Sequence, residues 1–360
     1  MRLSRAEAQE RNRARVLDAA RAEFTERGFR DAKIDTIAQR AELTRGAVYS
    51  NFPGKRALYF AVLADLAERA SAPSNPQRGA DLRTALGALA RAWVTSLGHD
   101  RLARDFMPEV VAEEVTRRPF TQLLKLDALL LSLAMEAVEP VASPFGAPPD
   151  GMAPSGMAPS RMVRKAEIVL TTLHGASQLA TAAPGFLEPF DVVSACEQLA
   201  GLELSDWWPP PPGAAVRRDD TPWTPPTVVD LVRGEPVTPN EDGLVVVLGL
   251  NRLAAVEEAV RTGARVTLAM VTGTPQELAP LARLVLAQLC VNLRQAFPTE
   301  AWPRVRVVCD ETGALAGAAG VPAVSDETET AIRVEGGRIV ARAEGSGAGH
   351  AVSGGARVRT

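Results

Sequence analysis

One stretch, residues 35–58, constrains the fold of this chain more than any other. It contains apolar residues at helical spacing, a break at Glu42, and then a second short segment that begins at Thr44. A threonine before a helix acts as an N-cap, because its hydroxyl accepts a hydrogen bond from a free backbone N–H of the first turn. The stretch therefore predicts two short helices joined by a tight turn. Four side chains of the second helix are expected to face outward: Arg45, Tyr49, Ser50 and Asn51.

This outline is that of a helix-turn-helix, in which the second helix enters the major groove of DNA. The residues that define it follow without a gap: Ile37, Ala38, Thr44, Gly46, Tyr49, Phe52, Lys55 and Leu58. In this register the stretch resembles the DNA-binding motif of the tetracycline-repressor (TetR) family of transcriptional regulators. Glu42 occupies the place of a turn glycine, and Lys33 that of a small polar cap. A glutamate held at positive φ costs about 1 kcal/mol.

The resemblance implies that the second helix and its flanks bind a double-stranded DNA operator. Arg45 is predicted to contact a base edge, because its guanidinium fork matches guanine O6 and N7. Tyr49 and Lys55 are predicted to contact phosphates, Lys55 from a helix N-terminus. Tyr49 could instead be a half-buried packing residue. The full set of candidate DNA-binding residues is Lys33, Thr44, Arg45, Gly46, Ala47, Tyr49, Ser50, Asn51 and Lys55.

The distribution of charge agrees with a DNA-binding N-terminus. Residues 1–60 hold 13 Lys and Arg against 8 Asp and Glu, whereas the whole chain carries a net charge of −3. Phosphate contacts supply most of the non-specific affinity for DNA, so a basic end is useful there. Chance clustering of solvated arginines is the alternative. The same choice, between a DNA-facing arm and a solubilising face, applies to five arginines at the N-terminus: Arg2, Arg5, Arg11, Arg13 and Arg15.

Helical periodicity continues to about residue 205. The first helix is expected over residues 5–28 and to end at Gly28, because glycine readily adopts the positive φ of a helix C′ position. Further helices are expected over 54–70, 81–97, 102–115, 119–138, 161–183 and 190–204.

The resemblance to TetR proteins implies that the helices of this body enclose an effector pocket, and that the last two form a four-helix interface in a homodimer. Core packing is the favoured alternative for the apolar candidates, and His174 could face either the pocket or the interface. The pocket candidates are Trp93, Phe106, Met107, Phe120 and His174.

After residue 205 the pattern changes. A proline-rich segment, 206–235, is expected to be a semi-rigid linker. Buried-strand runs then alternate with helical stretches and end in a hairpin across Gly336-Gly337, which predicts an α/β domain. This order of elements resembles the thioredoxin-like fold, nearest to its peroxiredoxin branch. The expected position of the active cysteine, residues 249–253, contains no Cys, so the resemblance implies a non-catalytic domain.

The fold class expected is multidomain: an all-α TetR-like part followed by an α/β thioredoxin-like domain. A tandem Gly-Met-Ala-Pro-Ser repeat at 151–160 is predicted to be a loop insertion. The expected boundaries are 1–60 for the helix-turn-helix domain, 61–205 for the effector-binding and dimerisation domain, 206–235 for the linker, 236–345 for the thioredoxin-like domain and 346–360 for a flexible tail.

These observations favour a cytoplasmic transcriptional regulator, an effector-released repressor acting as a homodimer, with an unknown small-molecule effector. No metal, no cofactor and no membrane partner are expected, since no apolar run approaches the length of a membrane span. A redox-responsive regulator that uses Cys290 or Cys309 is the second hypothesis. An enzyme activity in the C-terminal domain is the third, although no catalytic set of residues supports it.

Overall fold

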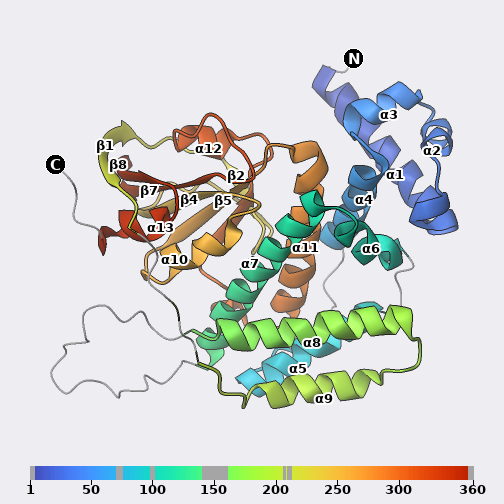
Figure 1. Ribbon diagram of the computed structural model, residues 1–360, viewed down its shortest axis with the longest axis horizontal. Helices are drawn as coiled ribbons and strands as arrows, with labels where there is room; N and C mark the ends of the chain where they lie inside the picture. The colour runs from blue at the N-terminus through green and yellow to red at the C-terminus, as the bar shows by residue number, and fades with distance from the viewer. Residues whose placement is uncertain are drawn as a thin grey trace.

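The computed structural model describes residues 5–69, 76–97, 102–139, 161–205, 208 and 213–355. Figure 1 shows a helical N-terminal part, coloured blue to green, and a sheet with flanking helices, coloured yellow to red. The predicted repeat at 151–160 lies outside the described residues, as does Arg2.

The N-terminal helices form a small bundle at one corner of the molecule (Figure 1). They are α1 (Arg5–Asp31), α2 (Ile34–Arg40), α3 (Arg45–Asn51) and α4 (Lys55–Arg69). Gly28 has φ 74°, so it interrupts α1 where the sequence predicts a helix end. The core of the bundle contains Phe24, Ile37, Val48, Phe52 and Tyr59, each at most 1% exposed.

The body contains α5 (Leu82–Leu97), the 3₁₀ turn η1 (Leu102–Asp105), α6 (Phe106–Val111), α7 (Glu114–Val138), α8 (Val163–Ala182) and α9 (Pro189–Leu199). The helix expected from Pro119 begins five residues earlier, at Glu114. The Thr116 hydroxyl stabilises this early start, because it donates to the carbonyls of Val110 (2.7 Å) and Glu113 (3.0 Å).

A six-stranded mixed sheet follows, in the order β1-β8-β7-β4-β5-β6. The three strands β4, β5 and β6 are parallel, and β7, β8 and β1 join antiparallel to their neighbours. A separate two-stranded ladder is formed by β2 and β3. The bounds are β1 (Val216–Pro222), β2 (Val228–Asp230), β3 (Glu235–Val237), β4 (Gly243–Gly249), β5 (Val266–Val271), β6 (Arg306–Cys309), β7 (Glu329–Glu335) and β8 (Arg338–Glu344).

The helices of this part cover both faces of the sheet. Val245 and Val247 of β4 face the cluster that contains α12, whereas Leu244, Val246 and Leu248 face the cluster that contains α10, α11 and α13. This alternation follows from the two-residue period of a strand. The elements are η2 (Leu253–Ala255), α10 (Val256–Val260), α11 (Pro275–Ala296), η3 (Thr299–Ala301), α12 (Ala314–Ala318), α13 (Ala348–His350) and the π-helical turn η4 (Ala351–Gly355).

Two segments are more ordered than the sequence predicts. The expected linker 206–235 contains β1, which pairs with β8 and extends the sheet, and also β2. The expected flexible tail from residue 346 contains α13 and η4, and Ala348, Ala351 and Val352 are buried. In both cases the segment reaches a hydrophobic or hydrogen-bonding partner that is distant in sequence, which local composition does not encode.

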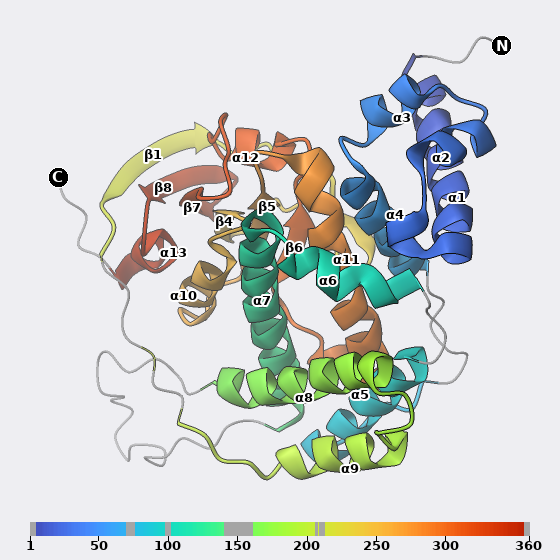
Figure 2. The ribbon, with the colours of Figure 1, turned by 45° about the vertical axis from the view of Figure 1, so that its right-hand side comes forward.

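The long helix α11 belongs by sequence to the sheet part but packs in the helical body. It contacts α4 more extensively than any other pair of described helices contact each other, and it also contacts α5 and α7. Figures 1 and 2 both show α11 beside α7, between the sheet and α4. Arg56 at the start of α4 pairs with Glu277 of α11 (3.0 Å), and Glu68 at its end pairs with Arg283 (2.7 Å).

One hydrophobic cluster therefore runs without a break from α1 to η4. It includes residues of the N-terminal bundle, the body, α11 and one face of the sheet. Among the described helices, none has the length and apolar character that crossing a membrane requires.

Candidate nucleic-acid interface and effector cavity

The helix α3 has the local structure expected of a recognition helix. Thr44 is its N-cap, and the Thr44 Oγ1 accepts a hydrogen bond from the backbone N–H of Ala47 (3.2 Å). Val48 is buried against the bundle, whereas Arg45, Tyr49 and Ser50 are exposed on the opposite side of the helix. The sequence-predicted outward face is confirmed for these three side chains.

Arg45 is held in position on this exposed face. Its guanidinium carbon lies 5.6 Å from the centre of the Tyr49 ring, and its Nη1 lies 3.4 Å from the Asp35 carboxylate. A hydrogen bond to Tyr49, and then the negative charge of Asp35, raise the pKa of Arg45. The side chain is still 61% exposed. The result is an oriented cation at the surface, which suits a base edge or a phosphate.

The turn between α2 and α3 contains the expected strain. Glu42 has φ 52° and is the one non-glycine residue with positive φ in the described part of the chain. Its carboxylate pairs with the Nη2 of Arg15 at 2.7 Å. The prediction that a glutamate replaces the usual turn glycine at positive φ is confirmed.

Two of the candidate DNA-binding residues have structural roles instead. Asn51 is 9% exposed and its Nδ2 donates to the carbonyl of Ala47 (2.8 Å), so the prediction that it faces outward is wrong. The Lys55 Nζ donates to the carbonyls of Arg30 (2.9 Å) and Ala32 (3.0 Å), at the end of α1. Helix carbonyls at a C-terminus lack intrahelical partners, and a lysine satisfies them there.

The remaining candidates lie around α3 but differ in availability. Lys33 is exposed and makes no side-chain cap bond. Gly46 is exposed and Ala47 half-buried in the first turn, and the Ser50 hydroxyl donates to the carbonyl of Ala47 (2.9 Å). In the arginine-rich start of α1, the Arg13 guanidinium lies over the Phe52 ring at 4.6 Å.

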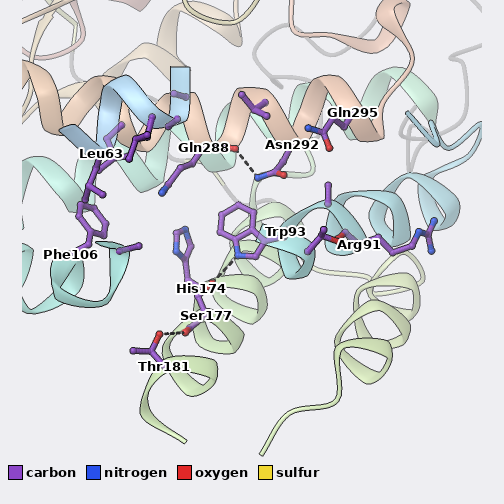
Figure 3. Close-up of a pocket in the computed structure, with 18 of the residues that line it drawn as sticks. Leu63, Arg91, Trp93, Phe106, His174, Ser177, Thr181, Gln288, Asn292 and Gln295 are labelled. Atoms are coloured by element: carbon purple, nitrogen blue, oxygen red, sulfur yellow. Dashed lines mark hydrogen bonds between the residues drawn. The ribbon is translucent and has the colours of Figure 1, made fainter. Parts of the chain in front are cut away.

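A cavity of about 710 Å³ lies where α4, α5, α6, α8 and α11 meet. Figure 3 shows its walls, with Trp93 on α5 and His174 on α8 facing Gln288 and Asn292 on α11. The Trp93 Nε1 donates to the Ser177 hydroxyl (2.9 Å), and the Trp93 and His174 rings meet edge-on at 5.0 Å. Burial lowers the pKa of His174 to about 4, so its imidazole is neutral at pH 7.

The structure places four of the five pocket candidates at this cavity: Trp93, Phe106, Met107 and His174 line it. Phe120 does not, because it is 8% exposed and packs edge-on against Phe106 (5.9 Å between ring centres). Sequence reasoning missed the wall that α11 supplies. The signal was a polar stripe at i, i+4 and i+7 on an otherwise apolar helix, formed by Gln288, Asn292 and Gln295.

The environments of the cysteines do not suit thiolate chemistry. Cys290 lies in the core between α11 and its neighbours, and burial raises the pKa of its thiol to about 12. Burial, and then the charge of Glu311, raise the pKa of the half-buried Cys309 thiol. A redox sensor needs an accessible thiol of lowered pKa. The local structure therefore gives the redox hypothesis no support.

The bundle of α1, α2 and α3 thus has the geometry of a helix-turn-helix DNA-binding domain. Residues 16–62 match the family model for bacterial regulatory proteins of the tetR family. The N-terminal domain of this chain is therefore a TetR-family helix-turn-helix domain.

Two curated proteins of Pseudomonas putida share this domain. The chain is 51% identical over 59 residues to the HTH-type transcriptional regulator SrpR, and equally so to the uncharacterized HTH-type transcriptional regulator TtgW. Each match covers 16% of this chain, and the matches span only 27% and 43% of the two relatives. A solved TetR transcriptional regulator from Rhodococcus sp. RHA1 is 19% identical with a TM-score of 0.35, over 54% of this chain and 95% of that chain.

Proposed function

We propose that the chain is a sequence-specific DNA-binding transcriptional regulator that acts as a homodimeric repressor in the cytoplasm and is released from its operator by a small effector. The observation that carries this proposal is α3, a capped helix with an oriented and exposed Arg45 on the side opposite the core. The TetR-family match of residues 16–62 supports it.

The route from effector to DNA passes through α4. This helix follows α3 directly, and its Leu63, Leu66 and Ala67 line the cavity. A ligand in the cavity therefore contacts the helix that carries the DNA-binding bundle. Release requires that the effector bind the DNA-free arrangement more tightly than the DNA-bound one, because only differential affinity shifts the population.

Apolar side chains exposed on and beside α8 and α9 support the homodimer. Phe186 and Phe190 are 69% and 77% exposed, and Ile168 and Leu179 are also exposed. Covering them with the same surface of a second copy would form an isologous interface. Two recognition helices in one dimer would then contact half-sites about one helical turn of DNA apart.

The sheet part enters this proposal as a thioredoxin-like domain without catalysis. Its order of elements is strand, helix, strand, long helix, strand, short helix and hairpin, which agrees with the order expected for that fold. The segment Gly249–Leu253 contains no cysteine. A turnover assay with peroxide or disulfide substrates tests this part of the proposal, and measurable turnover would contradict it.

DNA binding is tested with the full chain and its own upstream region by fluorescence anisotropy at several salt concentrations. We expect a steep loss of affinity as salt rises, because bound phosphates release counterions. Arg45→Ala is expected to weaken specific binding by about 1–3 kcal/mol, the worth of a good contact to a base edge. Tyr49→Ala should also weaken it, since Tyr49 orients Arg45.

Arg117→Ala serves as the matched control, because Arg117 is 59% exposed on α7, similar to Arg45, and lies outside the bundle. It should bind as the unmodified chain does. Full sequence-specific binding by both Arg45→Ala and Tyr49→Ala would show that the site is assigned to the wrong residues.

A further inference from the structure

The cavity beside α4 has a marked charge character. Its only ionised side chains are arginines, Arg91 and Arg104, and none of the described residues that line it is an Asp or a Glu. The imidazole of His174 is neutral at pH 7 because burial lowers its pKa to about 4. A cation placed here would find no counter-charge in the lining.

The two arginines differ in availability. Arg91 Nη1 lies 3.4 Å from the carboxylate of Glu197, which partly neutralises it. Arg104, in η1, is exposed and forms no ion pair with any residue in the described part of the chain. It therefore provides a positive charge at the edge of the cavity that is available to a ligand.

The wall from α11 adds neutral hydrogen-bonding groups. Asn292 Nδ2 donates to the backbone carbonyl of Gln288 (2.8 Å), and the side-chain amides of Gln288 and Gln295 make no hydrogen bond to the described residues. The Nε2 of His174 is buried and without a partner among them too. Polar groups in an enclosed site without partners are costly unless a ligand or water satisfies them.

The rest of the lining is apolar and faces these polar groups from α4, α6 and α11. It includes Leu63, Leu66, Phe106, Met107, Leu284 and Val291. A ligand that fits this cavity thus needs an apolar body and one polar end.

We propose that the cavity binds a small organic anion, an apolar chain or ring that carries a carboxylate. The carboxylate is held by Arg104 and the side-chain amides of α11, and the apolar body lies against α4 and α6. The sheet part of the chain thereby supplies a wall of the ligand site through α11. This inference rests on the proposed function only in treating the cavity as the effector site.

Three probes with the same eight-carbon chain separate charge from apolar contact: octanoate, 1-octanol and octylammonium, measured with the full chain by isothermal titration calorimetry at pH 7. Octanoate is expected to bind roughly tenfold or more tightly than octylammonium, because the only fixed charges in the lining are positive. Octanol should lie between them.

Variants locate the site. Arg104→Ala should weaken octanoate roughly fivefold and leave octanol unchanged, since it removes only the charge at the cavity edge. Ala287→Trp fills the cavity and should abolish binding of octanoate. Arg117→Ala, an exposed arginine away from the cavity, is the matched control and should bind all three probes as the unmodified chain does.

Octylammonium binding as tightly as octanoate, no binding of any probe, or octanoate affinity unchanged in both Arg104→Ala and Ala287→Trp would each overturn the inference. DNA binding is measured separately. A chain that binds DNA but no octanoate loses only this inference, and a chain that binds octanoate but no DNA loses only the proposed function.

Discussion

Lys55 shows how a side chain expected at a DNA phosphate can act within the protein instead. Its ammonium satisfies two carbonyls at the end of α1 and lies 4.7 Å from the centre of the Phe29 ring. Lys55→Met keeps the apolar stem and removes both bonds. We expect the free energy of unfolding to fall by about 1–2 kcal/mol, measured by urea denaturation, since hydrogen bonds from charged groups are worth more than neutral ones.

The same variant discriminates between the two roles of Lys55 in DNA binding. A phosphate contact would be lost as a decrease of about 0.9 in the slope of log affinity against log salt. The structure predicts an unchanged slope. Lys33→Met is the control, because Lys33 is exposed and makes no side-chain cap bond. Full stability of Lys55→Met combined with a reduced slope would contradict the capping role.

Glu258 in α10 makes stability depend on pH. Burial, and then the negative charge of Glu329, raise its pKa from 4.5 to about 7. The unfolded chain releases this proton at lower pH than the folded chain does, so stability should fall as pH rises from about 4.5 to 7. Glu258→Gln removes that proton release. We expect it to flatten the pH dependence in this range and to be about 1–3 kcal/mol more stable than the unmodified chain at pH 8.

Urea denaturation at intervals between pH 4.5 and pH 8 measures this effect. Glu300→Gln, a change at an exposed carboxylate, should leave the curve unchanged. If the Glu258→Gln curve falls between pH 4.5 and 7 as steeply as that of the unmodified chain, Glu258 is not its cause.

At the scale of elements, local patterns predicted most helices and strands but not their neighbours. The α2-turn-α3 unit follows from the Thr44 cap and the apolar spacing, and the β7–β8 hairpin from Gly336-Gly337. The strand β1 was hidden among prolines, because its pairing with β8 joins segments more than 100 residues apart.

The candidate site was predicted unevenly for the same reason. Arg45 and Tyr49 are exposed as the motif predicts, since a short helix with one buried face determines which side chains point outward. Asn51 was misplaced, because its side chain turns back to bond the Ala47 carbonyl, four residues earlier. The α11 wall of the cavity could not be predicted from a division of the chain at residue 205.

At the scale of the whole molecule, α11 joins what the sequence presents as two separate parts. Its apolar residues belong to the same cluster as those of α4, α5 and α7, and ion pairs fix it at both ends of α4. Without α11, the apolar faces of these three helices and the cavity would be open to water. The helical body is therefore completed by a segment that follows it by about 70 residues.

This arrangement predicts that residues 1–205 do not form a stable body alone. Leu281, Leu284, Leu289 and Leu293 of α11 are at most 1% exposed, and burying four such side chains contributes about 6–12 kcal/mol. A typical domain is stable by only about 5–15 kcal/mol. We expect the 1–205 fragment to aggregate, or to unfold without a cooperative transition, when followed by size-exclusion chromatography and by circular dichroism in urea.

The control separates loss of α11 from loss of chain continuity. A protease site inserted at Gly213, in the segment before β1, allows the full chain to be cut after folding. Because the cluster is continuous, the two pieces should stay together on the size-exclusion column and unfold near the urea midpoint of the uncut protein. A 1–205 fragment that unfolds cooperatively at that same midpoint would mean that α11 adds nothing to the stability of the body, and that its contacts with α4 serve only to position the sheet.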